Sequence, residues 1–192
     1  MAQSIVDCCN NALQMLGQTF IMSLTDGTRT SRQCQMASDN NRRAELRKYN
    51  WNFAKKRIVL APDTIAPAFH FKYQFTLPSD CLRIIIPRDA TLDWSIEGKK
   101  ILTNEVDNEL APTLNLCYTA DITDPSLFDG AFYDMYSTAM AIDMCEAITN
   151  STSKKAALER QYDDALQRAR LANAFEELPE EAPDDTFWTC RY

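Results

Sequence analysis

The chain of 192 residues has the length of one domain, or of one domain that carries a small insertion. Hydrophobic residues make up 45% and charged residues 24%, which is typical of a soluble globular protein. No apolar run is long enough to cross a membrane, and the N-terminus lacks the basic start and apolar stretch of a secretion signal. We therefore expect a soluble protein of the cytoplasm, or of a particle that is assembled there.

The net charge of -7 is distributed unevenly along the chain. The segment 42–57 holds seven bases and one acid, whereas the segment 176–185 holds six acids and no base. Such segregation is typical of surfaces that meet different partners. The alternatives are two solvated faces, or an acidic tail that folds onto the basic helix of a neighbour.

Two helices are expected in the first 56 residues. Ser4 can cap the first helix, Asp7 stands three residues further on, and Gly17 offers a left-handed stop. The second helix begins near residue 26 or 28 and runs to about residue 51 or 54. Its apolar stripe is thin for its length, which predicts that its other faces meet water or another subunit.

The middle of the chain changes character, because five prolines between residues 62 and 112 divide it into pieces too short for helices. Hydrophobic and polar residues alternate over residues 73–77, which is the period of a half-buried strand. Residues 82–86, 92–96, 101–102 and 114–118 have similar strand patterns. We expect residues 57–120 to form a small, mainly antiparallel β-subdomain.

Helices return after this β-subdomain. Asp124 followed by Pro125 predicts the cap and first residue of a third helix that continues to about Thr149. A turn at residues 150–153 leads into a fourth helix, which Pro179 ends. The predicted fold class is α+β: a four-helix, mainly α-helical bundle with an inserted antiparallel β-subdomain and an extended C-terminal arm. The parts are residues 1–56 (helical), 57–120 (β-rich insertion), 121–178 (two long helices) and 179–192 (arm).

The arm combines many acids with three large aromatic residues, Phe187, Trp188 and Tyr192. It cannot bury enough apolar surface to order on its own. Large aromatic residues on a terminal arm are typical of docking onto another molecule, often an adjacent subunit. Disorder with incidental aromatic residues is the alternative.

Little in the sequence points to catalysis or to a cofactor. The seven cysteines include one adjacent pair and no C-x-x-C, so we expect reduced thiols and no metal site. The single histidine, His70, is expected to be structural or at the surface. The four glycines form no phosphate-binding loop, and Asp163 with Asp164 lies on an exposed-looking helix face. We therefore expect a protein that is not an enzyme and that binds no metal or cofactor.

The basic segment 42–57 also contains Tyr49, Trp51 and Phe53, so contacts to phosphates and stacking on bases are both compatible with it. The acidic balance of the whole chain argues against a domain that reads nucleic-acid sequence. We favour aromatic residues that pack in the core and bases that meet an acidic protein partner. The bases predicted to bind the partner are Arg42, Arg43, Arg47 and Lys48. A small DNA-binding or packaging-associated protein is the alternative.

Several motifs resemble one protein family in their order and spacing. Residues 12–17 (ALQMLG), with Ile21 and residues 23–26 (SLTD), resemble the start of the tail tubular protein A family, the head-to-tail adaptors of short-tailed phages. Residues 43–46 (RAEL), 51–54 (WNFA) and 57–60 (RIVL) are similar to the second helix of that family and its exit. Tyr73 with residues 77–83 (LPSDCLR) resembles the strand motif that follows. The resemblance covers essentially the whole chain.

This resemblance implies a structural virion protein of the phage neck, assembled in the host cytoplasm. It implies a helical bundle with an inserted β-part, arranged with copies of itself as a twelve-fold ring below the portal protein. The helical side would face the portal, and the β-side would face the nozzle, tail tubular protein B. The C-terminal arm would reach onto the portal or onto a neighbouring adaptor. Duplex DNA would pass through the lumen of the ring without sequence readout.

Overall fold

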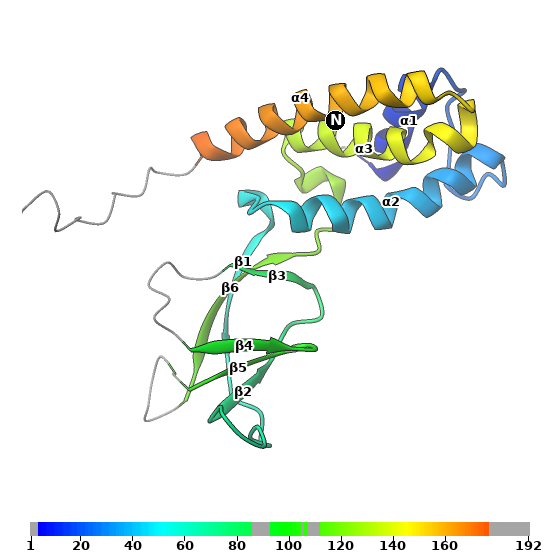
Figure 1. Cartoon of the computed structure of the whole chain (residues 1–192). Helices are drawn as coiled ribbons and strands as arrows, with labels where there is room; N and C mark the ends of the chain where they lie inside the picture. The colour runs from blue at the N-terminus through cyan, green and yellow to red at the C-terminus, as the bar shows by residue number, and fades with distance from the viewer. Residues whose placement is uncertain (1–3, 86–92, 105, 107–111, 177–192) are drawn as a thin grey trace, which may run out of the picture.

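The computed structural model describes residues 4–85, 93–104, 106 and 112–176. The chain forms a helical part and a β-part that meet end to end, so that the molecule is bent like the letter L (Figure 1). The β-part is inserted between α2 and α3, which confirms the predicted α+β class and the order of its elements. No helix of the described part of the chain is both long and apolar enough to span a membrane.

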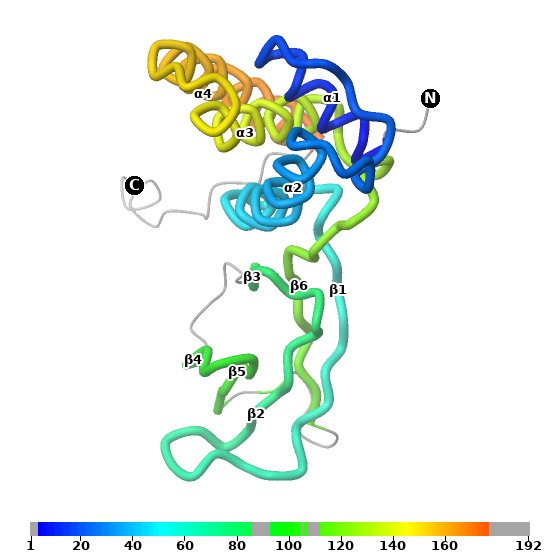
Figure 2. The backbone as a smooth tube through the Cα atoms, turned by 90° about the vertical axis from the view of Figure 1, so that its right-hand side faces the viewer, coloured from blue at the N-terminus to red at the C-terminus, as the bar shows by residue number. Residues whose placement is uncertain are grey.

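Four helices make up the helical part, and α3 lies at its centre. They are α1 (Ile5–Leu16), α2 (Arg29–Lys48), α3 (Gly130–Thr149) and α4 (Thr152–Phe175). α3 packs against each of the other three helices, whereas α1 and α2 meet over only a few residues (Figure 2). α3 is apolar on most of its circumference, as a helix surrounded by others has to be.

The beginning of α1 follows the predicted capping signals closely. Ser4 and Asp7 form a complete capping box, and Gly17 ends the helix with the left-handed φ of 71°. α2 is capped by Thr28, in agreement with one of the two predicted starts.

The predicted end of α2 at residue 51 or 54 is wrong, because the helix stops at Lys48. Tyr49 is extended, and the indole of Trp51 turns back into the core, where its Nε1 donates a hydrogen bond to the Glu45 carbonyl at 3.0 Å. Only a short 3-10 turn, Asn52–Ala54, follows. The burial of Trp51 therefore outweighs the helical periodicity of the sequence.

The predicted start of the third helix is also displaced. Asp124 and Pro125 begin a separate 3-10 turn, Pro125–Leu127, and α3 starts at Gly130 with Asp129 as its cap. A capping aspartate followed by proline suits the first turn of either kind of helix, so the local signal does not distinguish them. α3 ends at Thr149 as predicted, and α4 ends at Phe175, three residues before the predicted boundary at 178.

The β-part consists of two three-stranded antiparallel sheets. In the first sheet the order is β1 (Lys55–Leu60), β6 (Leu114–Ala120) and β3 (Cys81–Ile85). In the second it is β2 (Tyr73–Thr76), β5 (Lys100–Thr103) and β4 (Trp94–Glu97). The antiparallel β-insertion is thus confirmed, although it begins at residue 55 and not at 57.

The continuous hydrophobic core lies in the helical part and extends into the near end of β6. Its aromatic centre contains Trp51, Phe53 and Phe132, with ring centroids of Trp51 and Phe132 5.1 Å apart. β1, in contrast, is an edge strand on which Ile58 and Val59 are exposed. The first sheet is therefore joined to the helical core through β6, whereas Phe75, Ile101 and Leu102 of the second sheet are buried outside that core.

Candidate interaction surfaces

The C-terminal half of α2 faces the joint between the two parts, where α2 packs against β3 and β6. The guanidinium of Arg42 is buried, with 6% of the side chain exposed, and its Nε lies 3.0 Å from Oδ1 of Asp121. Arg43 binds the other oxygen of the same carboxylate at 2.8 Å. Because Asp121 directly follows β6, these two ion pairs fasten α2 to the end of the first sheet.

Burial opposes the charge of Asp121, but the hydrogen bonds and charges of Arg42 and Arg43 outweigh it, so the pKa of Asp121 lies below its usual range. Arg42 also binds Asp39. Its guanidinium is thus occupied within the chain, and among the four bases predicted to bind a partner only Arg43, Arg47 and Lys48 are exposed.

A second contact of the joint is a reciprocal pair of arginines. Arg47 of α2 donates to the Leu82 carbonyl on β3 at 2.6 Å. Arg83, also on β3, donates to the carbonyls of Arg47 and Lys48 at 3.1 and 3.3 Å and to the side chain of Asn50. A cation is favourable at the C-terminus of a helix, where carbonyl groups lack helical partners. Arg83 therefore both ends α2 and positions β3.

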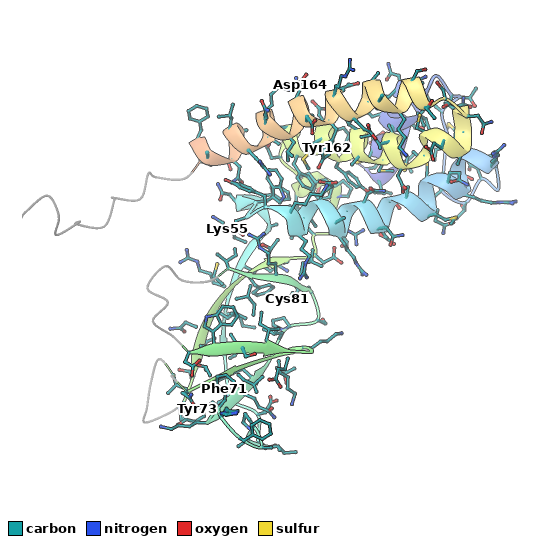
Figure 3. The ribbon with its side chains drawn as sticks, in the orientation of Figure 1. Lys55, Phe71, Tyr73, Cys81, Tyr162 and Asp164 are labelled. Atoms are coloured by element: carbon teal, nitrogen blue, oxygen red, sulfur yellow. The ribbon has the colours of Figure 1, made fainter. Side chains whose placement is uncertain are left out.

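Lys48 belongs to a polar cluster between α2 and α4. Its Nζ lies 2.7 Å from Glu45 Oε1 and 2.8 Å from the hydroxyl of Tyr162, which in turn donates to Glu45 Oε2 at 2.7 Å. Burial opposes the charge of Lys48, but Glu45 and Tyr162 outweigh it and raise the pKa of the lysine. Figure 3 shows Tyr162 on the inner side of α4 and Asp164 on its outer side.

No local signal in the sequence indicates the partners of these bases, because the partners are remote in the chain. Asp121 is 79 residues from Arg42, and Tyr162 is 117 residues from Glu45. Lys56 similarly binds Asp80 at 2.8 Å, and Tyr118 donates to the same carboxylate at 3.1 Å. The Lys56 ammonium lowers the pKa of Asp80. Burial raises it, but by less, so the pKa lies below its usual range.

At least five of the seven bases in segment 42–57 thus have partners within the chain. They are Arg42, Arg43, Arg47, Lys48 and Lys56. The prediction that the aromatic residues of this segment pack in the core is confirmed, since Trp51 is buried and Tyr49 and Phe53 are half-buried against the core. The segment works mainly as the joint of the molecule, and Trp51 is not available for stacking on a base.

The two carboxylates of the joint make its stability depend on pH. The pKa values of Asp80 and Asp121 are both below the ordinary value of 3.8. A carboxyl group whose pKa is lower in the folded than in the unfolded state stabilises the fold at a pH above its unfolded-state pKa. This contribution is lost as the pH falls through the pKa of the folded state. We therefore expect the difference in unfolding free energy between the wild type and Asp121→Asn to be constant above about pH 5 and to shrink below about pH 4.

Urea unfolding at a series of pH values measures this difference. Asp164→Asn is the matched control, because that carboxylate is exposed on α4 and should give little difference at any pH. A difference for Asp121→Asn that stays the same from pH 6 to the acid limit of folding would contradict the assignment.

The remaining predicted residues lie apart from the joint. His70 is exposed in the loop between β1 and β2, with a positive φ of 66°, and its ring contacts Phe69. Four cysteines are buried and two are half-buried, and these six are free thiols: Cys8, Cys9, Cys34, Cys81, Cys117 and Cys145. Within the described ranges, no group of three or more His, Cys, Asp or Glu side chains is placed to hold a metal ion. The predicted docking residues Phe187, Trp188 and Tyr192 lie outside the described residues.

Four of the exposed large hydrophobic residues lie in two loops at the far ends of the two parts, and others lie elsewhere on the surface, for example Phe175 at the end of α4. In the loop between α1 and α2, Phe20 and Met22 are 63% and 90% exposed. In the loop between β1 and β2, Ile65 and Phe69 are both 74% exposed. These loops lie at the distal ends of the helical part and of the β-part (Figure 1). Large exposed apolar side chains that cluster are typical of surfaces that bind other proteins.

Comparison with known proteins adds no relative at this point: no family model matches the chain, and no curated protein matches it.

Proposed function

We propose that this chain is a structural virion protein, the subunit of a head-to-tail adaptor ring in a short-tailed phage. In this proposal it joins the portal to the nozzle and forms part of the channel for DNA ejection, and it carries out no catalysis. The observation that supports this most directly is the two-ended architecture: a helical part and a β-part, joined by the buried ion pair of Arg42 and Asp121, each with exposed apolar residues at its outer end.

An adaptor must bind different partners at its two ends and hold them in a fixed relation. The joint suits this task, because Asp121 with two arginines and the reciprocal Arg47–Arg83 contacts oppose bending between the parts. In the proposal, the helical part around α3 is the four-helix bundle that faces the portal. The β-part faces tail tubular protein B, and copies of the chain close into a twelve-fold ring.

Electron microscopy of the purified chain mixed with portal rings of short-tailed phages tests the proposal. We expect ring density of twelve subunits on one face of the portal, with the helical part next to it. Adding tail tubular protein B should extend the density at the β-end.

The charge-neutral variant Phe20→Ser with Met22→Ser should weaken attachment to the portal, whereas Ile65→Ser with Phe69→Ser should weaken attachment to the nozzle alone. A chain that attaches to no portal, or whose two variants have interchanged effects, would contradict the proposal. Retardation of duplex DNA by the free chain, with a steep dependence on salt, would instead favour the DNA-binding alternative.

A further inference from the structure

A groove of about 620 Å³ lies between the end of α2, β3 and the hairpin of β4 and β5. Its apolar lining includes Ile84 and Trp94, both half-buried, and Ile96, which is 46% exposed. Cys81, labelled in Figure 3 below α2, belongs to the same lining. An apolar lining that keeps this much exposure is suited to cover by another segment.

The polar lining of the groove is positively charged. Three bases contribute to it, Arg47, Arg83 and Lys99, and none of the described residues that line it is acidic. Arg47 and Arg83 bind neutral oxygens, namely backbone carbonyls and the side chain of Asn50, so these contacts orient the guanidiniums without cancelling their charge. The groove is therefore complementary to a segment that is acidic and aromatic.

The C-terminal segment of the same chain, which follows α4, has this composition. Residues 177–192 hold five acids, one base and the aromatic residues Phe187, Trp188 and Tyr192. The last turn of α4 is fixed beside the groove, because the side chain of Asn173 accepts from the Asn52 amide at 2.7 Å and donates to the Asn50 carbonyl at 3.2 Å. Asn50 is itself a lining residue of the groove. A segment of sixteen residues can span about 50 Å, which is ample for this distance.

We propose that this groove is the docking site for the C-terminal segment 177–192 of the same chain. Its acids face Arg47, Arg83 and Lys99, and its aromatic side chains cover the apolar lining. The docking does not depend on the adaptor function. Where that function holds, a partner that binds the segment has to displace it from the groove first.

Zero-length carbodiimide crosslinking of the free, full-length chain tests the proposal. The reagent activates a carboxyl group, the Nζ of a nearby lysine attacks it, and an amide forms while the reagent leaves as a urea. We expect an amide between Lys99 and an acid of residues 177–185, found by mass spectrometry of the digested monomer. Its yield should not change on tenfold dilution, because both groups belong to one chain.

The chain carries its own positive controls for this reaction. Lys56 lies 2.8 Å from Asp80 and Lys155 lies 3.1 Å from Glu146, so both pairs should crosslink under the same conditions. Trp188→Ala should reduce the Lys99 crosslink severalfold, whereas Phe69→Ala, an exposed aromatic residue at the far end of the β-part, should leave it unchanged.

Three outcomes would overturn the proposal. The first is the absence of the Lys99 crosslink while both control pairs react. The second is a crosslink of segment 177–185 to lysines outside the groove alone. The third is a Lys99 crosslink that appears only between chains and declines on dilution, which would make a second copy the occupant. The crosslinking experiment contains no portal, so a negative result would not contradict the adaptor proposal. Equally, a chain that attaches to no portal would not contradict the docking of segment 177–192 in the groove.

Discussion

Replacing Arg42 by alanine is expected to lower the free energy of unfolding by about 3–5 kcal/mol. The guanidinium is buried between Asp121 and Asp39, and its removal leaves the carboxylate of Asp121, which is only 11% exposed, with Arg43 at the surface as its remaining ion-pair partner. Breaking one half of a buried ion pair costs more than the pair contributes, because the remaining charge cannot regain its hydration. Urea denaturation followed by circular dichroism measures the loss.

Arg43→Ala is the matched control for this experiment. It removes an ion pair with the same carboxylate, but the Arg43 side chain is 63% exposed, so the expected cost is below about 1 kcal/mol. The double variant Arg42→Met with Asp121→Asn should recover part of the loss, since no unpaired buried charge remains. Equal effects of Arg42→Ala and Arg43→Ala would show that the buried pair does not hold the joint.

Replacing Trp51 by alanine is expected to cost a similar amount, about 3–5 kcal/mol. The side chain is 1% exposed and packs against Phe132, and its indole N–H donates to the Glu45 carbonyl. The substitution therefore leaves a large cavity in the core and an unpaired carbonyl at the end of α2.

Circular dichroism is again the suitable signal, because the variant loses one of the three tryptophans. Phe175→Ala, at a position that is 87% exposed, is the control and should change stability by less than about 0.5 kcal/mol. If Trp51→Ala left stability unchanged but abolished binding to DNA, the aromatic residues of segment 42–57 would have a stacking role after all.

The cap signals at the start of the chain show what local sequence can predict well. Ser4, Asp7 and Gly17 act through hydrogen bonds to residues three or four positions away and through the conformational freedom of glycine, so their effect does not depend on the rest of the fold. The alternation in residues 73–77 similarly predicted β2, because a half-buried strand imposes a period of two.

The functions assigned to single bases could not be predicted in the same way. Segment 42–57 has the composition of a binding surface, yet Arg42 is buried. Arg47 donates to the carbonyl of Leu82, and Arg83 donates to the carbonyl of Arg47. Whether an arginine is a surface charge or an internal tie depends on which remote residue the fold brings to it. That information is absent from the residues next to it in the sequence.

Local periodicity, capping and composition are enough to predict the α+β class, the order of the elements, the cap of α1 and the separation of basic and acidic segments. The local sequence does not predict that α2 ends at Lys48, that Asp121 and Asp80 bind the bases of the joint, or that a basic groove lies between α2 and the β4–β5 hairpin. These features arise from contacts between residues far apart in the chain, where burial and charge pairing outweigh local preference.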